Sequence, residues 1–274
     1  MSADTVRKTA SVRNSGEEMS AFSVTFVVGA TSEAEALRTT VDTILSVCAP
    51  QDIARVLVVR SRNAAPETVA VSEEMERRYP DKVKGMVQTR PHIGGAIRDG
   101  FDTAVSSHIL LLPGDLAIDL AAVPVLIEME KNRPDGIVKT SRWLNGGAFH
   151  GYAPLRKCLN ACAQMFLRVA YRTNLTDLTN PVQIMPTALY RAIDWKELDF
   201  PFLAEMVLCP LRLGASFYEV PAACFARTEG RSNNSVMQTA LYLKTALRIR
   251  FTPPNRLLKP KERTGQFAGL RKRK

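Results

Sequence analysis

Residues 86–119 read MVQTRPHIGGAIRDGFDTAVSSHILLLPGDLAID, and this stretch decides the fold class. Residues 83–88 can pair in a sheet, and residues 96–105 have helical spacing. Residues 109–112 form a continuous apolar run, which is typical of a strand buried on both faces. A strand, a helix and a buried strand in this order predict one unit of a parallel sheet.

The two turns of this stretch predict a ligand site. Pro91 and the pair Gly94-Gly95 separate the first strand from the helix, so we expect free backbone N–H groups that could hold a diphosphate above the strand ends. Asp115 follows the second strand at the carboxyl edge of the sheet, where open α/β sheets bind ligands and where a carboxylate could hold a divalent ion. The alternative interpretation is an ordinary surface turn that contains an aspartate.

The rest of the first half alternates strand and helix in the same way. Strand signals recur at residues 22–28, 54–59 and 136–140, and helical spacing recurs at residues 32–47, 66–79 and 121–132. Five strand signals with helices between them predict an α/β fold, an open and mostly parallel sheet with helices on both faces. The second half differs, with long helices over residues 155–172 and 203–213. A hairpin is expected there, formed by residues 216–220 and 223–227 around Pro221.

Size, cysteines and hydropathy give a broad class. A chain of 274 residues with 46% hydrophobic residues is long enough for one α/β domain. The five cysteines include no C-x-x-C pair, and Cys158 and Cys162 lie one helical turn apart on an apolar segment, so packing is expected for them in a reducing, cytoplasmic compartment. The sequence contains no signal-peptide core and no run of 18 apolar residues, so no membrane-spanning segment is expected.

The net charge of +10 is concentrated near the C-terminus. Residues 252–274 are basic and interrupted by prolines, and they are expected to form a disordered tail, as are residues 1–20. Residues 236–251 have helical spacing, with Val236, Ala240, Leu243 and Leu247 on one face, a pattern suited to an anionic membrane surface. An ordinary helix packed on the core is the alternative. Nucleic acid is not an expected partner, because no binding motif or interleaved aromatic residues occur.

Seven segments match a known family in order and spacing. They are VTFVVGATSEAEALRTTV, RPHIGGAIRDGF, ILLLPGDL, KTSRWLNGG, LTDLTNPVQ, FLAEMVLCPLRLGASFYEVP and FARTEGRSN. With them the chain resembles family 2 glycosyltransferases of the GT-A fold, and within these the dolichyl- or polyprenyl-phosphate sugar transferases. The resemblance implies a glycosyltransferase domain over residues 21–235, with a nucleotide half at 21–150 and an acceptor half at 151–235. It also implies inverting transfer from a nucleotide sugar to a polyprenyl phosphate or a glycan, by a cytoplasmic enzyme peripheral to the membrane.

The resemblance assigns roles to residues of the nucleotide half. Glu33 is similar to the acidic residue that contacts the nucleoside. Gly94, Gly95 and Arg98 match the loop and helix beside the diphosphate. Asp115 matches the second aspartate of the family's Asp-x-Asp motif, which implies contact with the sugar nucleotide and with Mg²⁺ or Mn²⁺.

In the acceptor half the resemblance implies four catalytic residues. Arg142 and Asp177 match the family's Gly-Ser-Arg segment and the aspartate before its Thr-Gly turn, and Arg227 and Ser232 match a segment near the acceptor phosphate. A structural interpretation remains open for some of these residues. Asp177 is also typical of a turn, and Glu205 with Arg227 could form a structural ion pair.

The chain departs from the family in its two acidic motifs. Residues 60–63 are Arg-Ser-Arg-Asn where the family has Asp-Asp-x-Ser, so Ser61 is the candidate that remains there for the nucleotide. Pro113 replaces the first aspartate of the metal motif, and Asn233 replaces a lysine. Metal affinity is therefore expected to be low, and Arg98 and Arg142, with Arg60 or Arg62, are expected to take over part of the metal's role.

Two other functions remain open at this point. A degenerate protein of this kind could bind a nucleotide, a lipid or a protein without turnover. A transferase could instead use a saccharide hydroxyl, which needs a general base, and Asp177 is the candidate. The sequence does not indicate the oligomeric state.

Overall fold

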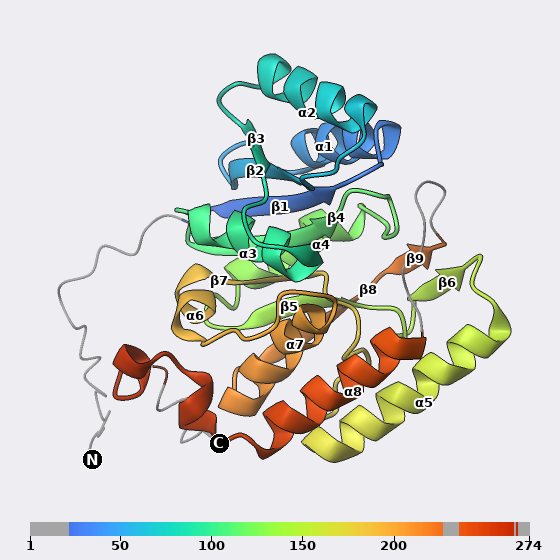
Figure 1. Ribbon diagram of the computed structural model, residues 1–274, viewed down its shortest axis with the longest axis vertical. Helices are drawn as coiled ribbons and strands as arrows, with labels where there is room; N and C mark the ends of the chain where they lie inside the picture. Colours follow the sequence, from blue (N-terminus) through green and yellow to red (C-terminus); the bar gives the residue numbers. More distant parts are fainter. Residues whose placement is uncertain (1–21, 227–235, 266, 268–274) are drawn as a thin grey trace, which may run out of the picture.

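A computed structural model describes residues 22–226, 236–265 and 267 of the chain. Seven strands form one sheet in the order β3-β2-β1-β4-β7-β5-β8, with helices on both faces (Figure 1). The strands are β1 Val24–Ala30, β2 Ile53–Arg60, β3 Val83–Val87, β4 His108–Pro113, β5 Ile137–Ser141, β7 Gln183–Pro186 and β8 Phe217–Pro221. β7 is antiparallel to β4 and β5, and the other neighbours are parallel. The prediction of an open, mostly parallel α/β sheet is confirmed.

The helices follow the predicted alternation closely. They are α1 Glu35–Val47, α2 Pro66–Arg78, α3 His92–Thr103, α4 Ala122–Lys131, α5 Pro154–Tyr171, α6 Thr187–Ala192, α7 Pro201–Leu213 and α8 Val236–Phe251. Two short strands, β6 Ala148–His150 and β9 Ala223–Phe225, form a separate parallel pair. α2, α5 and α7 each begin with a proline, which is preorganised for the first helical turn and lacks an N–H that would have no partner there.

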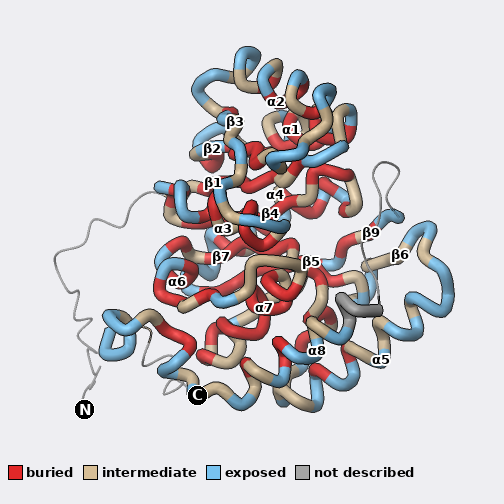
Figure 2. Tube along the Cα trace, in the orientation of Figure 1, coloured by how far each residue is buried: buried red, intermediate tan, exposed pale blue. Residues whose placement is uncertain are grey.

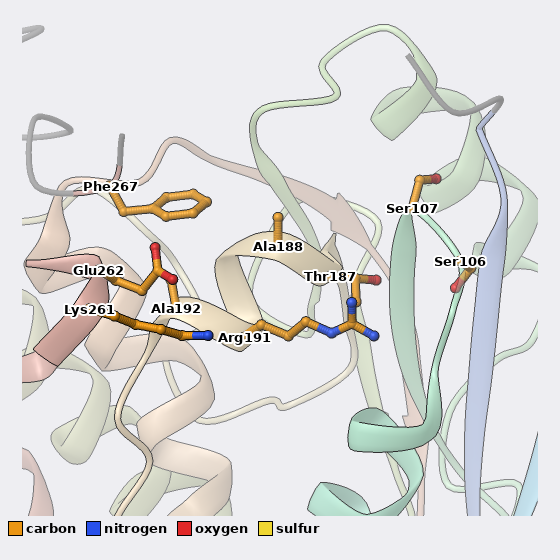
Figure 3. Close-up of a pocket in the computed structure, with 9 residues that line it drawn as sticks. All are labelled: Ser106, Ser107, Thr187, Ala188, Arg191, Ala192, Lys261, Glu262 and Phe267. Carbon is orange, nitrogen blue, oxygen red and sulfur yellow. The ribbon is translucent and has the colours of Figure 1, made fainter. Parts of the chain in front are cut away.

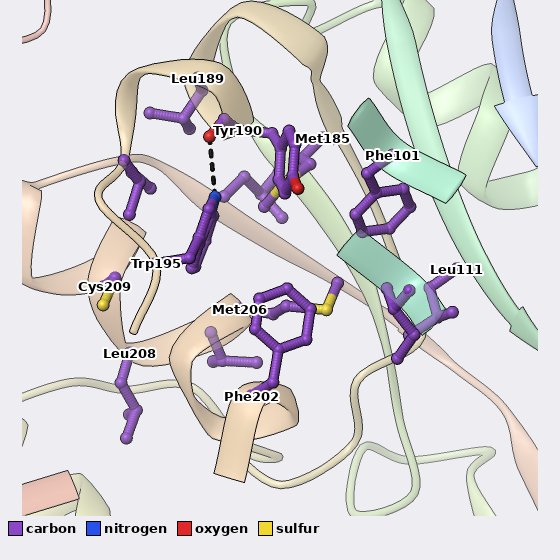
Figure 4. Close-up of a cluster of buried hydrophobic side chains, with 14 of the residues drawn as sticks. Phe101, Leu111, Met185, Leu189, Tyr190, Trp195, Phe202, Met206, Leu208 and Cys209 are labelled. Carbon is purple, nitrogen blue, oxygen red and sulfur yellow. Dashed lines mark hydrogen bonds between the residues drawn. The ribbon is translucent and has the colours of Figure 1, made fainter. Parts of the chain in front are cut away.

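Alternate residues of the central strands supply two cores, one on each face of the sheet. Val27 of β1 packs with α3 and α7, whereas Phe26 and Val28 pack with α1, α2 and α4. The buried segments of Figure 2 therefore concentrate along the sheet and the inner faces of the helices. The first core is aromatic, and in it Trp195 Nε1 donates to Tyr190 O at 2.9 Å (Figure 4). This two-sided burial explains the continuous apolar runs of the sequence.

β7 was not predicted, and the predicted hairpin is wrong. β7 has four residues, QIMP, too few to produce a strand signal, yet it lies between β4 and β5. β8 pairs in parallel with β5, and β9 crosses to β6 instead of returning along β8. Pro221 ends β8 and has no N–H to donate, so the chain leaves the sheet there.

The prediction of a disordered tail is wrong for residues 252–265. Two 3₁₀ helices, Pro254–Leu257 and Pro260–Glu262, follow α8. Leu257 and Leu258 are buried, and Leu258 forms an antiparallel bridge with Ile193. The prolines prevent an α-helix, but these two leucines supply enough apolar burial to hold the segment on the core. The predicted tails at residues 1–20 and after residue 267 lie outside the described residues.

The two long helices of the second half, α5 and α8, expose apolar residues. α8 packs on the core through Thr245, Ala246 and Ile249, as the alternative expects, but Leu243 and Leu247 of the predicted stripe are 45% and 39% exposed. Of the α5 side chains, Gln164 and Leu167 are buried, and the prediction that packing explains Cys158 and Cys162 is wrong because both are exposed. Within the described residues no helix is long and apolar enough to span a bilayer.

Candidate functional site

The loop after β4 brings Asp115 to the carboxyl edge of the sheet. Its carboxylate is 5% exposed, and Oδ1 accepts a hydrogen bond from Ala117 N at 3.1 Å. The loop then pairs with β9, because Phe225 N donates to Ala117 O. A side chain at Gly114 would lie 2.6 Å from Gly29 O of β1, so glycine is required for this close approach. Asp115 is thus held in a defined place at the predicted edge.

Glu33 and Ser61 lie in the loops after β1 and β2, at the same edge. Glu33 Oε2 accepts hydrogen bonds from Thr31 N at 2.7 Å and Ser32 N at 2.8 Å. Ser61 N donates to Ala30 O at 3.0 Å, and this bond ties the two loops together. Both predicted nucleotide residues therefore shape the loops of the edge where Asp115 lies.

The glycine pair at the start of α3 packs against the acceptor half. Gly95 N donates to Leu198 O at 2.8 Å, and a Cβ on Gly94 would lie 2.6 Å from Phe202 Cβ. Contrary to expectation, the Gly95 N–H is therefore not open to a diphosphate. One turn later Arg98 Nη1 donates to Glu197 O at 3.3 Å, and its buried Nε has no hydrogen-bond partner among the described residues.

Arg60 and Arg62, at the end of β2, have structural partners. Arg60 lies 3.5 Å from Glu73 in α2. Arg62 Nε donates to Gln88 O at 3.2 Å, which joins the ends of β2 and β3. These contacts tie the end of β2 to α2 and to the end of β3, a role that the sequence pattern did not indicate.

Arg142 and Asp177 form a buried pair beside β5. Arg142 Nε donates to Asp177 Oδ2 at 2.7 Å and Nη2 donates to Asp177 Oδ1 at 2.9 Å, so the guanidinium and the carboxylate make a bidentate contact. Asp177 is 0% exposed. Burial alone would raise its pKa, but the attraction and hydrogen bonds of Arg142 outweigh burial and hold the pKa of Asp177 below its ordinary value.

A wider polar network fixes this pair. Asp177 Oδ1 also accepts from Gln164 Nε2 of α5 at 2.9 Å, and Glu219 of β8 accepts from Asp177 N at 2.9 Å. Lys139 is fully buried, and its ammonium donates to Asp177 O. Burial lowers the pKa of Lys139. Sequence reasoning missed these network residues, and the signal that could have found them is the lysine within the strand signal at residues 136–140.

The remaining acceptor-side candidates separate into two groups. Arg227 and Ser232 lie outside the described residues. Glu205 is buried and pairs with Arg248 of α8, so its structural interpretation holds, while the predicted pairing with Arg227 lies outside the described residues. Burial raises the pKa of Glu205 despite that pairing.

A divalent ion would have few protein ligands at this edge. Among the described residues, no group of three or more His, Cys, Asp or Glu could hold a metal ion. Asp115 offers a carboxylate at this edge that suits Mg²⁺ or Mn²⁺, and Mg²⁺ commonly takes one or two carboxylates together with phosphate oxygens and water. The residues thus fit an ion that arrives with a diphosphate.

A cavity of about 510 Å³ lies at the opposite edge of the sheet (Figure 3). It is bordered by Ser106 and Ser107 before β4, by Arg191 of α6 and by Lys261 of the C-terminal segment. The amino ends of parallel strands meet at this edge. The cavity is therefore separate from the residues that the sequence singled out.

The fold is shared with solved glycosyltransferases. No family model matches the chain. Glucosyl-3-phosphoglycerate synthase from Mycobacterium tuberculosis, solved with UDP, is similar over 85% of this chain and 82% of its own, with a TM-score of 0.62 and 14% identity. Its complex with Mn²⁺, UDP-glucose and phosphoglyceric acid covers 85% and 81% of the two chains, with a TM-score of 0.60 and 13% identity. The chain has the GT-A fold.

Proposed function

We propose that this protein is a glycosyltransferase that moves a sugar from a nucleotide diphosphate sugar, with inversion, to a polyprenyl phosphate. The observation that carries the proposal is the common edge: Glu33, Ser61 and Asp115 follow neighbouring parallel strands of a GT-A fold. Ligands of open α/β sheets bind outside this edge. The mycobacterial synthase, whose structures contain UDP and UDP-glucose, supports a nucleotide sugar as donor.

The Arg142–Asp177 pair supports a phosphate as acceptor. A saccharide hydroxyl needs a general base, but the Asp177 carboxylate is buried, bound to Arg142 and depressed in pKa, so it is poorly suited to take a proton. A phosphate monoester has a second pKa near about 6 and is largely ionised at neutral pH. It therefore attacks without a base, and Asp177 acts by orienting Arg142 toward the anions.

The sugar transfer itself needs charge stabilisation on the leaving diphosphate. Asp115 would hold Mg²⁺ or Mn²⁺, which neutralises that charge when bound. The Nε of Arg98, in the middle of α3, has no hydrogen-bond partner among the described residues and is a second candidate donor to an anion. Arg60 and Arg62 are assigned to structure because of their bonds to Glu73 and Gln88.

The acceptor class and the cellular location belong to the same proposal. The mycobacterial synthase was solved with phosphoglyceric acid, a small phosphate compound, and a polyprenyl phosphate presents the same group on a lipid. All five cysteines are free, which supports a reducing, cytoplasmic location. A polyprenyl phosphate would require a peripheral position on the membrane.

The test is donor binding followed by transfer. We expect UDP-sugars or GDP-sugars with Mn²⁺ to raise the melting temperature, because a ligand of the native state stabilises it. We then expect radiolabelled sugar to enter an organic phase with polyprenyl phosphate, and NMR of the product to show the anomer opposite to the donor. Arg142→Lys should lose at least tenfold in rate, since lysine cannot make the bidentate contact. The surface variant Arg77→Lys is the matched control. Label recovered in phosphoglyceric acid instead would overturn the lipid acceptor.

Metal dependence separates two forms of this mechanism. Appreciable transfer after EDTA treatment, with a large loss in Arg98→Ala, is expected if arginine shares the metal's role. Complete dependence of transfer on added metal would refute a role for arginine in neutralising the leaving diphosphate. The ion held by Asp115 would then neutralise that charge alone.

A protein that binds nucleotide without turnover is the second candidate. Its support is the loss of acidic residues at the end of β2, where Arg60 and Arg62 have structural roles. It predicts a thermal shift with nucleotide diphosphates but no product with either acceptor.

A further inference from the structure

The outward side of α5 is apolar and faces solvent. Leu155, Leu159, Met165, Phe166 and Val169 are exposed, from 45% for Phe166 to 72% for Val169. Leu155, Leu159, Phe166 and Val169 recur at steps of four, seven and three residues and so lie on one face of the helix. The opposite face carries the two buried residues of this helix, Gln164 and Leu167. α5 therefore presents its main apolar face away from the core.

α8 extends this surface. It runs beside α5 at the lower right of Figure 1, where Arg250 Nε donates to Ala170 O at 2.5 Å and Tyr171 OH donates to Ala246 O at 2.6 Å. Leu243, Leu247 and Phe251 are 45%, 39% and 77% exposed. Leu243 and Leu247 lie seven and three residues before Arg250, on the same side of α8. Phe166 lies four residues before Ala170, on the same side of α5. Because Arg250 contacts Ala170, the apolar residues of the two helices adjoin. We call this two-helix surface the outer face.

The charged residues of the two helices themselves are all basic. The sequence of α5, PLRKCLNACAQMFLRVAY, contains three basic residues and no acidic residue, and that of α8, VMQTALYLKTALRIRF, likewise contains three and none. Arg168 and Lys244 are exposed. An exposed apolar surface of this extent marks an interaction site. Two adjoining helices whose own charged residues are all basic fit an anionic partner.

We propose that the outer face docks on an anionic lipid bilayer. Helices with an apolar face and basic flanks lie in the interface plane, with the apolar side chains among the acyl chains and the cations at the headgroups. A second copy of the chain fits less well, because two such faces would bring their basic rims together without carboxylates from either helix to pair them. The proposal does not rest on sugar transfer, because docking needs neither donor nor acceptor.

Docking would bring the bilayer close to the buried polar network. The inner side of α5 contacts that network, with Gln164 Nε2 2.9 Å from Asp177 Oδ1. A helix is about 10–12 Å across with its side chains, so the bilayer surface would lie roughly one helix diameter from Asp177. A lipid phosphate could therefore reach the acceptor half without leaving the membrane.

The first test uses two exposed cysteines as natural probes. Cys158 and Cys162 lie on the outward side of α5, whereas Cys48, Cys209 and Cys224 are buried, so a thiol-reactive, environment-sensitive fluorophore should label α5 selectively. We expect a blue shift when vesicles of phosphatidylglycerol and phosphatidylcholine are added. Vesicles of phosphatidylcholine alone should give little shift, and high salt should reduce binding. No shift with anionic vesicles would overturn the proposal.

Cosedimentation of the unlabelled full chain with the same vesicles tests which residues of the outer face contribute to binding. Leu159→Gln/Phe166→Gln and Arg168→Glu/Lys244→Glu should each weaken binding at least tenfold, through lost apolar contact and lost cations respectively. Val105→Gln/Val125→Gln and Arg55→Glu/Arg77→Glu make matched changes at exposed positions elsewhere and should leave binding unchanged. Circular dichroism checks that each variant is folded.

Light scattering distinguishes the bilayer from a second copy. We expect the wild-type chain and the Leu159→Gln/Phe166→Gln double variant to have the same mass in solution. A dimer that these substitutions convert to a monomer, together with equal vesicle binding by all variants, would reassign the outer face to self-association. Sugar-transfer activity is measured separately in detergent, so failure of docking and failure of the proposed transferase function give different results.

Discussion

Asp177 shows how a single residue can look catalytic in the sequence and act as a support in the fold. A polar residue in a loop between apolar segments is typical of both a turn and an active site. The structure gives Asp177 no exposure and hydrogen bonds from Arg142, Gln164 and the backbone of Asn180. Its chemistry is thus fixed by partners up to 42 residues away in the chain, which no local pattern encodes.

Removing the Asp177 charge should destabilise the protein and flatten its acid response. Asp177→Asn breaks a buried ion pair, which typically costs about 3–5 kcal/mol. Because the folded pKa of Asp177 lies below its unfolded value of about 4, its contribution is present above that value and is lost as the pH falls through the folded pKa. Urea midpoints measured from neutral pH to below about pH 4 should fall for the wild type and less steeply for the variant. The exposed Asp81→Asn is the control, and an equal slope in Asp177→Asn would contradict the assignment.

Gly94 is a second residue whose role the fold redefines. We expect Gly94→Ala to cost about 1–3 kcal/mol, because its Cβ would lie 2.6 Å from Phe202 Cβ and 2.7 Å from Leu198 C. Gly29→Ala is the matched control, since a Cβ there meets nothing within 4 Å. Thermal melting of both variants measures the difference. A Gly94→Ala protein with an unchanged melting temperature and weakened nucleotide binding would restore the diphosphate role.

Among the elements, the strongly periodic ones were predictable and the short ones were not. The sequences of β4 and α2 gave clear signals, because a long apolar run or several helical turns repeat one pattern of burial. β7 and β6 have four and three residues, and their pairing partners lie far away in the chain. Their existence depends on strands that were already in place beside them.

The C-terminal segment is an element that composition alone misjudged. Leu258 is fully buried and bridges to Ile193, so Leu258→Ala should cost about 2–5 kcal/mol in the free energy of unfolding. The exposed neighbour Arg256→Ala serves as control and should cost far less. Urea denaturation followed by circular dichroism measures both. A loss below about 0.5 kcal/mol for Leu258→Ala would show that the segment contributes little to the folded state.

In the whole molecule, the two cores cannot unfold independently. Ile109 and Leu111 of β4 belong to one core, and Leu110 and Leu112 belong to the other. Because one strand supplies both, separating it from either face destroys the other. The nucleotide half and the acceptor half are therefore expected to unfold together.

We expect a single cooperative transition as a result. Leu126→Ala and Leu208→Ala lie in different cores and should each lower the urea midpoint. In both variants, tryptophan fluorescence and far-ultraviolet circular dichroism should change together. Two separated transitions in either variant would show that the halves unfold as independent domains.

The sequence by itself determined the parallel α/β sheet and the edge where Asp115 lies, because apolar runs and turn residues report local burial and local breaks in the chain. Tertiary structure decided the rest. It inserted β7, closed the Gly95 amide onto Leu198 and buried Asp177 against Arg142. It also turned the apolar side of α5 to solvent, since a helix has one face for the core and the polar network of Gln164 occupies it. Periodicity shows that a face exists, and its neighbours in space decide what that face contacts.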